Sequence, residues 1–274
     1  MASGTLYVVA TPIGNLDDIT KRAIDTLSSV DIIAAEDTRH TKKLLTRFGI
    51  KTKMVSYYEH NELKRAAELV GRLKEGCDVA LVSDAGTPGV SDPGYRLVKA
   101  AALALVKIVA IPGASALTAA LSVSALPIDS FSFKGFLPAR STARKNFFLS
   151  LRGTEETVVV YDSPKRLPKT LMDIEATLGD IEIVIARELT KLHEEIIRGR
   201  VGELSALLKR RELKGEITLV LRTEAVKADI KDLAGELKKF LSAGLSLNEA
   251  AKTAASEFGI SKSRAYKEAL KIRK

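Results

Sequence analysis

Residues 79–94 read Val79-Ala80-Leu81-Val82-Ser83-Asp84-Ala85-Gly86-Thr87-Pro88-Gly89-Val90-Ser91-Asp92-Pro93-Gly94, and the fold can be inferred outward from them. The apolar run 79–82 predicts a buried strand, and a helical pattern begins at Tyr95. The loop between them is rich in glycine and proline, which let a backbone approach a ligand and fix its path. In open α/β sheets such a loop, at the carboxyl end of a strand, binds ligands. An ordinary strand-to-helix turn is the alternative, although such turns have only about 2–6 residues.

The loop has the wrong composition for a phosphate site. It contains neither a Lys followed by Ser or Thr nor a G-x-G-x-x-G pattern. Its acids, Asp84 and Asp92, would repel a pyrophosphate and would suit an amine, a ribose hydroxyl or a cation. The loop therefore favours a nucleoside that carries positive charge.

Four other apolar runs in the first half of the chain have the same character. Each ends in a polar or glycine-bearing loop, and helical patterns separate them; the runs are Thr5–Ala10, Ile32–Ala35, Met54–Ser56 and Lys107–Ile111. This alternation predicts an α/β fold with a parallel, doubly wound sheet. We expect the five loops to gather at one edge of the sheet and form a pocket there. Asp17 or Asp18 is expected to cap the helix that runs through Leu27.

The second half repeats the α/β pattern and then changes. Residues 126–130 suggest a linker, and the alternation over residues 193–200 predicts an antiparallel strand. A polar linker over residues 224–230 leads into a helical tail, where Ser246 and Glu249 form a capping box. A turn at Gly259-Ile260, followed by a cap at Ser261, gives the tail a helix-turn-helix shape. The expected domains are two α/β domains, over residues 1–125 and 126–223, and a helical RNA-contacting module over residues 224–274.

Composition sets limits on function. The 274 residues carry a net charge of +9, which favours a polyanionic partner, and 46% of them are hydrophobic, enough for a sizeable core. The single cysteine, Cys77, excludes a disulfide framework. No apolar run is long enough to span a membrane and no signal peptide is visible, so we expect a cytoplasmic protein.

Seven motifs together resemble those of a known family. The chain carries Ala10-Thr11-Pro12-Ile13-Gly14-Asn15-Leu16, Ala35-Glu36-Asp37-Thr38-Arg39, Glu59-His60-Asn61-Glu62, Ser83-Asp84-Ala85-Gly86-Thr87-Pro88-Gly89, Pro112-Gly113-Ala114-Ser115-Ala116, Gly135-Phe136-Leu137-Pro138 and Ala186-Arg187-Glu188-Leu189-Thr190-Lys191. In this order they resemble the ribosomal RNA small-subunit methyltransferase I group, within the tetrapyrrole-methylase-like, class III S-adenosylmethionine-dependent enzymes. The resemblance covers about residues 4 to 222. The chain departs from the expected Tyr-Glu-Ser-Pro-His-Arg at residues 161–166, which weakens a role for a longer acid at Asp162 or for a histidine at Lys165.

The resemblance implies two α/β domains with S-adenosylmethionine in the cleft between them, and a homodimer. The implied reaction transfers a methyl group to the 2′-hydroxyl of a cytidine in the decoding region of small-subunit (16S) rRNA. The partner would be small-subunit rRNA or the assembled small ribosomal subunit.

Site residues follow from motif position. Those expected to bind the cofactor are Pro12, Ile13, Asp84, Ala85, Gly86, Thr87, Ser115, Ala116, Tyr161 and Asp162. Those expected near the reacting atoms are Glu36, Asp37, Arg39, Glu59 and His60. Glu36 or Glu59 could accept the hydroxyl proton if burial raises its pKa, whereas a purely structural network of these charges is the alternative. RNA contacts are expected from Arg140, Arg144, Lys145, Lys165, Arg166, Lys262, Arg264 and Lys267. The three histidines lack metal-ligand spacing, so no metal is expected.

Two other functions stay open from the sequence. A methyltransferase acting on a porphyrin-like small molecule would not need the basic tail. A non-catalytic RNA-binding protein would use the helix-turn-helix tail and would need no cofactor.

Overall fold

The computed structural model describes residues 3–154, 156–209, 211, 213–223, 230–258 and 262–272. The chain divides into two compact units. The first consists of Met1–Ala120 and Glu188–Glu194, and the second of Leu121–Arg187 and Glu195–Lys274. Residues 188–194 thus belong to the first unit although the sequence around them belongs to the second. Among the described residues, no helix is long and apolar enough to cross a membrane.

The first unit contains a five-stranded sheet in the order β3-β2-β4-β1-β5. Its strands are β1 (Thr5–Val9), β2 (Ile32–Ala35), β3 (Lys53–Ser56), β4 (Val79–Val82) and β5 (Lys107–Ile111). Every pairing in this sheet is parallel, which confirms the fold expected from the five apolar runs. The carboxyl ends of all five strands therefore lie at one edge, with their loops.

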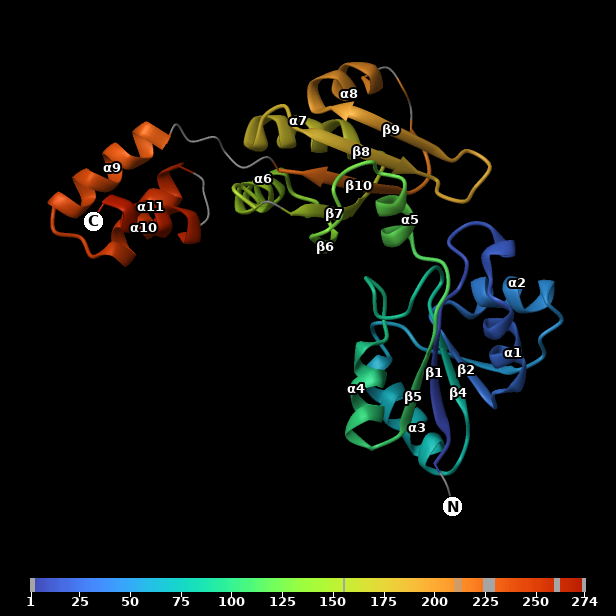
Figure 1. Cartoon of the computed structure of the whole chain (residues 1–274). Helices are drawn as coiled ribbons and strands as arrows, with labels where there is room; N and C mark the ends of the chain where they lie inside the picture. The colour runs from blue at the N-terminus through green and yellow to red at the C-terminus, as the bar shows by residue number, and fades with distance from the viewer. Residues whose placement is uncertain are drawn as a thin grey trace. The chain divides into compact units, whose positions relative to one another are not determined.

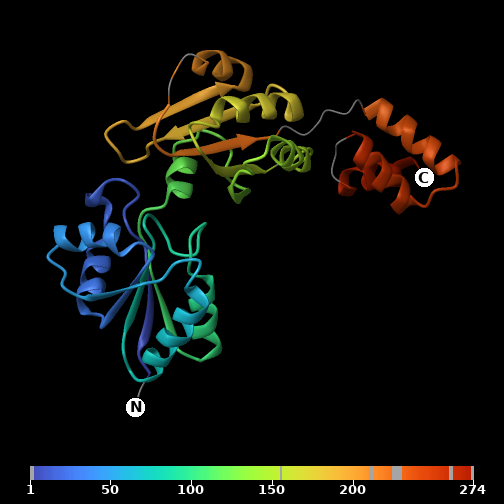
Figure 2. The same cartoon turned by 180° about the vertical axis from the view of Figure 1, so that it is seen from behind.

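Helices cover both faces of this sheet (Figures 1 and 2). They are α1 (Lys21–Ser29), α2 (Thr38–Arg47), α3 (Glu62–Lys74) and α4 (Tyr95–Leu103), with the short 3-10 helix η1 (Leu16–Asp18) before α1. Leu69 of α3 and Leu97 of α4 share one core with Leu81, whereas Leu27 of α1 and Leu45 of α2 share another with Val82. Burial on both faces explains why these strands are continuous apolar runs.

The start of α1 differs from the expectation. Asp17 and Asp18 lie in η1, where the Asn15 side chain accepts a hydrogen bond from the Asp17 N–H. The cap of α1 is Thr20, whose hydroxyl accepts from the Ala23 N–H at 3.1 Å. The prediction that Asp17 or Asp18 caps this helix was wrong, because the tight turn of η1 takes up these residues and moves the helix start further along the chain.

The second unit contains a mixed sheet in the order β6-β7-β10-β8-β9. Its strands are β6 (Phe131–Phe136), β7 (Thr157–Asp162), β8 (Glu182–Arg187), β9 (Glu195–Arg200) and β10 (Ile217–Arg222). The pair β6 and β7 is parallel and the other pairs are antiparallel, including β9, as its alternating pattern predicts. One face packs on α6 (Ser141–Ser150), α7 (Leu167–Leu178) and α8 (Val201–Leu208). The helix α5 (Ala116–Ser122) lies in the chain where the first unit gives way to the second.

The tail folds around its own small core. The helices α9 (Ile230–Ser242), α10 (Leu247–Phe258) and α11 (Lys262–Ile272) bury alanines and leucines against one another. The expected capping box is present, because the Ser246 N–H donates to Glu249 Oε2 at 3.0 Å and the Glu249 N–H donates to Ser246 Oγ at 3.3 Å. The expected turn and cap at residues 259–261, and residues 224–229 of the expected linker, lie outside the described residues.

Candidate functional site

The loops after β1 and β4 are joined at the carboxyl edge of the first sheet. The N–H groups of Thr11 and Gly86 each donate to the other residue's carbonyl, at 2.9 and 3.0 Å. The Thr11 hydroxyl also donates to the Ser83 carbonyl at 3.1 Å. The start of the motif loop at residues 83–86 is therefore fixed against the first loop.

Gly86 is the point at which three loops meet. Its φ of +75° lies in the left-handed region, where glycine carries no steric penalty. A Cβ there would lie 3.6 Å from Ile13 Cγ2 and 3.8 Å from the Ala114 carbonyl oxygen. The loops after β1, β4 and β5 thus come within van der Waals distance of one backbone position. Among the expected cofactor residues, this brings Ile13 close to Gly86 and to the chain that leads into Ser115 and Ala116.

The loop after β2 meets the motif loop through carboxylates. The Asp84 N–H donates to Glu36 Oε2 at 3.2 Å, and the Asp37 N–H donates to Asp84 Oδ1 at 3.1 Å. These reciprocal bonds hold two acidic side chains side by side. Among the described residues, neither Glu36 nor Asp84 forms an ion pair with Lys or Arg.

Burial and crowding change the acidity of this cluster. Burial raises the pKa of Glu36 above its usual range, and repulsion from Asp84 and Asp37 adds to the rise, against the hydrogen bond from Asp84. Burial likewise raises the pKa of Asp92 to about 6, with repulsion from Glu36 and Asp84 adding to it. Glu36, Asp84 and Asp92 therefore form a cluster of negative charge, and binding of a cation there would be electrostatically favourable.

The remaining catalytic candidates differ in their pairing and exposure. Asp37 caps α2 by accepting from the Arg39 N–H at 2.8 Å, and its carboxylate pairs with the exposed Arg39 guanidinium at 2.9 Å. That hydrogen-bonded partner lowers the pKa of Asp37 to about 2, so Asp37 is a poor proton acceptor at neutral pH. Glu59 and His60 are both exposed after β3. Of the two acids considered as a base, Glu59 is exposed, whereas Glu36 is partly buried and burial raises its pKa.

The segment Glu188–Glu194 adds Lys191, which was not among the site residues predicted from the sequence. A Cβ on Gly14 would lie only 2.4 Å from Lys191 Cγ, so the aliphatic part of Lys191 lies directly against the loop after β1. The Lys191 ammonium pairs with Glu188 at 2.9 Å. Thr190 has a φ of +67°, a strained conformation for a β-branched residue, and its Oγ1 is buried without a hydrogen-bond partner among the described residues.

Two of the expected cofactor residues, Tyr161 and Asp162, lie in the second unit. Asp162 is buried and accepts from Arg166 Nε at 2.9 Å and from the Thr170 hydroxyl at 2.6 Å. Its carboxylate is therefore already committed to structural partners. Tyr161 is half-buried, with its ring in edge contact with Phe133 and Phe136 at centroid distances of 4.9 and 5.3 Å.

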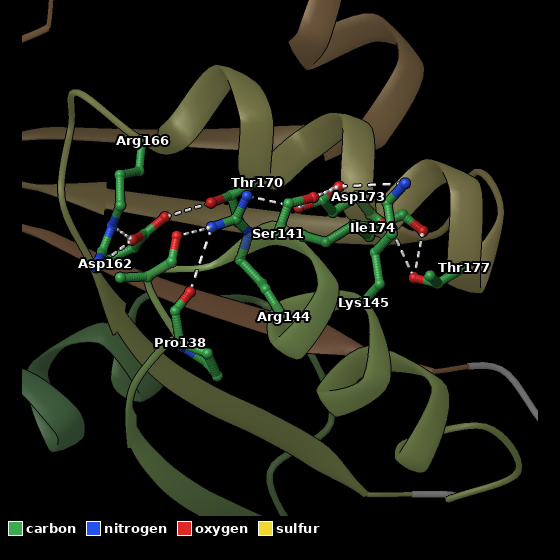
Figure 3. Close-up of polar contacts among 11 residues, drawn as sticks. Pro138, Ser141, Arg144, Lys145, Asp162, Arg166, Thr170, Asp173, Ile174 and Thr177 are labelled. Carbon is green, nitrogen blue, oxygen red and sulfur yellow. Dashed lines mark hydrogen bonds and ion pairs between the residues drawn. The ribbon is translucent and has the colours of Figure 1, made fainter.

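Arg144 does not fit its expected role as an RNA contact. It is 2% exposed and pairs with Asp173 at 2.5 Å, as Figure 3 shows. Its Nη1 group also donates to the Pro138 and Ala139 carbonyls, both at 3.2 Å. The prediction was wrong because the basic face of α6 turns this arginine inward onto α7, where it holds the turn that follows β6.

The other expected RNA contacts differ in exposure. Arg140 and Lys165 are exposed, Lys145 is half-exposed beside Asp173, and Arg166 is largely committed to Asp162. In the tail, Lys262 and Lys267 are exposed on α11, and Arg264 is half-buried. Among the described residues, no group of three or more His, Cys, Asp or Glu side chains could hold a metal.

Two residues at this edge were not among the site residues predicted from the sequence. Asp92 is an acid of the motif loop, but its approach to Glu36 depends on contacts across 56 positions of the chain. Lys191 belongs to one of the seven motifs, and only its contact with Gly14 gives it a place in the first unit.

Comparison with known proteins gives consistent results. The family model described as Tetrapyrrole (Corrin/Porphyrin) Methylases matches residues 5–205. A Synechocystis protein named Ribosomal RNA small subunit methyltransferase I is 43% identical over 274 residues, covering 98% of both chains. Proteins of the same name from Escherichia coli O157:H7 and Vibrio cholerae are 45% and 46% identical, covering 98% and 96% of this chain and 96% and 93% of theirs.

Solved structures share the fold at lower identity. A diphthine synthase matches with a TM-score of 0.61 at 18% identity, covering 80% of this chain and 90% of its own. The uroporphyrin-III-C-methyltransferase of Thermus thermophilus matches with a TM-score of 0.56 at 20% identity, covering 79% of this chain and 94% of its own. These likenesses establish the tetrapyrrole methylase fold.

Proposed function

Because the chain belongs to the ribosomal RNA small subunit methyltransferase I family of the tetrapyrrole methylases, we propose that it methylates small-subunit rRNA with S-adenosylmethionine. The methyl acceptor in this proposal is the 2′-hydroxyl of a cytidine in the decoding region of 16S rRNA. The relatives' name supplies the methyl transfer and the RNA substrate. The cofactor, the 2′-hydroxyl and the cytidine are our extension.

The observation that carries the proposal is the set of carboxylates at the edge of the first sheet. Glu36, Asp84 and Asp92 lie together without a Lys or Arg ion-pair partner among the described residues. A site of this kind repels phosphate and attracts a cation. S-adenosylmethionine carries both a sulfonium and an ammonium group, so the charge of the site fits it. The left-handed Gly86 backbone, with no Cβ between Ile13 and Ala114, lets a ligand approach closely.

Each residue has a proposed part in binding. Pro12 and Ile13 line the pocket with apolar surface, and residues 84–87 wrap the ligand. Ser115 and Ala116 meet it from the loop after β5, and Tyr161 is the candidate from the second unit. Both carboxylate oxygens of Asp162 already accept hydrogen bonds, from Arg166 and Thr170. Its proposed part is therefore limited to positioning Arg166.

Methyl transfer also requires removal of a proton from the acceptor hydroxyl. When bound, S-adenosylmethionine supplies an activated methyl group with a good leaving group. Glu36 is the proposed general base, because its raised pKa makes it a stronger proton acceptor than an ordinary carboxylate. One of its oxygens accepts the Asp84 N–H, which fixes the side chain and leaves the other oxygen for the hydroxyl. Arg39, which is 90% exposed although paired with Asp37, is placed to attract an RNA phosphate.

Basic residues of the second unit and the tail would hold the RNA. Arg140, Lys165, Lys262 and Lys267 are exposed cations whose contribution would be electrostatic and would fall with added salt. We further propose that the protein is a cytoplasmic homodimer, which sedimentation analysis of the purified chain would test.

Two measurements test the proposal. Mass spectrometry of 16S rRNA from cells with and without the gene should show one 2′-O-methylated cytidine that disappears with the gene. Calorimetry with S-adenosylmethionine should show saturable binding to the purified protein, which Asp84→Asn weakens. Unchanged rRNA in the deletion strain would rule out the substrate, and absence of binding heat together with absence of a thermal shift would rule out the cofactor.

A further inference from the structure

A row of aromatic side chains lies on one face of β6 and β7 in the second unit. Register pairs Phe131 with Thr157 and Phe133 with Val159, and side chains alternate between the faces of a sheet. Residues 158 and 160 of β7 pack in the core under α6–α8. Val159 and Tyr161 therefore lie on the opposite face, and Phe131 and Phe133 lie there with them.

A β-bulge places Phe136 on the same face. The register shifts between Phe133 and Phe136, so that Phe136 pairs with Tyr161. Without the extra residue, alternation from Phe133 would turn Phe136 toward the helices. Gly135, at a φ of +68°, lies within this irregularity. The bulge thus redirects a large apolar side chain out of the core, and Phe136 is 62% exposed.

The backbone behind Phe136 is held rigidly. The Leu137 N–H donates to the Tyr161 carbonyl at 3.0 Å, which joins the ends of the two strands. Buried Arg144 then donates to the Pro138 and Ala139 carbonyls, and Figure 3 shows its pair with Asp173. These bonds hold the turn that directly follows Phe136.

Two exposed cations lie in loops at the same end of the sheet as this ring. Because β6 and β7 are parallel neighbours, the loops that follow them lie at the same end, and they carry the exposed Arg140 and Lys165. The acid at this end of β7, Asp162, is buried in its pair with Arg166. Exposed Lys214 and Glu216, which precede β10 at the same end, add one charge of each sign.

We propose that Phe136, supported edge-on by Tyr161, is a stacking surface for an unpaired nucleobase of the RNA, and that Arg140 and Lys165 hold the adjoining phosphates. Exposed aromatic rings between cations are the features that proteins use to bind single-stranded RNA. An apolar protein partner would not require the cations. This inference rests on the proposed function, since it specifies how the same enzyme would hold its RNA.

The test uses the absence of tryptophan from the chain. Phe136→Trp introduces the only tryptophan, at the end of β6, and Phe131→Trp, at the 46% exposed start of the same strand, is the matched control. A single-stranded RNA oligonucleotide with the decoding-region sequence should quench the fluorescence of the Phe136→Trp variant on binding and leave that of the Phe131→Trp variant nearly unchanged. Phe136→Ala should weaken RNA binding on the order of tenfold, as loss of one stacked base predicts, whereas Phe136→Tyr should retain most of it.

The outcomes separate this inference from the proposed function. If the wild-type protein methylates rRNA, but Phe136→Ala binds RNA as tightly as wild type and RNA leaves the Phe136→Trp variant unquenched, the stacking surface is wrong and the function stands. If Phe136→Ala instead changes the oligomeric state, the ring belongs to a contact between copies of the chain, which also overturns the inference. A wild-type protein that neither binds nor methylates RNA overturns the function itself.

Discussion

The carboxyl edge of the first sheet and the corresponding end of β6 and β7 in the second unit have opposite charge. At the first edge Glu36, Asp84 and Asp92 have no ion-pair partner among the described residues, and at the second Asp162 and Asp173 are each neutralised by a buried or half-buried arginine. Acidic side chains are therefore left available in one unit and neutralised in the other. From this difference we infer that the two units bind ligands of opposite charge, a cationic small molecule in the first unit and a polyanion in the second.

The largest expected effect, on the free energy of unfolding, comes from removing the arginine that neutralises Asp173 in the second unit. Arg144→Met leaves the buried Asp173 carboxylate with the Ser141 hydroxyl and a half-exposed Lys145 as neighbours, and loss of one partner of a buried pair costs about 3–5 kcal/mol of unfolding free energy. Urea unfolding followed by circular dichroism measures this loss.

The controls use one exposed and one compensating variant. Arg140→Met, in the exposed turn before α6, should change stability by less than about 0.5 kcal/mol. Arg144→Met combined with Asp173→Leu should recover much of the loss, because no unpaired charge remains. Equal destabilisation by the Arg140 and Arg144 variants would show that the buried pair has no special role.

The second prediction concerns catalysis at the acidic edge. Glu36→Gln removes the proposed proton acceptor and should lower kcat by about 10²–10³-fold, while the Kd for S-adenosylmethionine changes little. Glu59→Gln, exposed after β3, is the control and should change kcat by less than about threefold. Single-turnover methylation of rRNA gives the rates, and calorimetry gives the Kd. A fully active Glu36→Gln enzyme would contradict the assignment.

The third prediction uses the raised pKa of Asp92. Since its folded pKa of about 6 exceeds the ordinary value of 3.8, the folded state binds the proton more tightly, and stability decreases as pH rises from about 4 to about 6. Asp92→Asn removes this penalty and should stabilise the protein at pH 7 by about 1–2 kcal/mol after allowance for solvent screening. The difference from wild type should vanish below about pH 4, as denaturation at several pH values would show. The same variant should bind S-adenosylmethionine more weakly, and a variant that neither gains stability nor loses affinity would remove Asp92 from the site.

The smallest expected effect concerns charge at the second edge. Arg140→Gln or Lys165→Gln should each reduce the slope of log K for single-stranded RNA against log salt concentration by about 0.7. The control is Lys107, which is exposed at the amino end of β5 in the first unit. Lys107→Gln should leave the slope unchanged. Equal slopes for all three variants would show that the second edge does not bind RNA.

The sequence is a good guide to the sheets and to the loops that follow their strands. Strands such as Val79–Val82 are buried on both faces, so hydrophobicity alone marks them, and parallel topology then puts their loops at one edge. This reasoning places Glu36 and Asp84 at that edge from the sequence alone. Their mutual hydrogen bonds, at 3.1 and 3.2 Å, could not be inferred because they depend on backbone geometry.

Features that depend on residues far apart along the chain could not be predicted from the sequence. Arg144 lies in a basic helix and has no local sign of burial, because its partner Asp173 comes 29 positions later. The contact of Lys191 with Gly14 joins residues 177 positions apart. The bulge before Phe136 left only one local signal, the glycine at 135, which by itself is equally typical of a turn.

The assignment of Glu188–Glu194 to the first unit has a consequence for biosynthesis. A ribosome must translate residues 121–187 of the second unit before it delivers Lys191, whose side chain covers Gly14. A nascent chain released near residue 120 would hold all five strands of the first sheet and yet lack the piece that lies over its first loop. We therefore expect the acidic edge to reach its final form only late in translation, after Arg140 and Lys165 have already been synthesised.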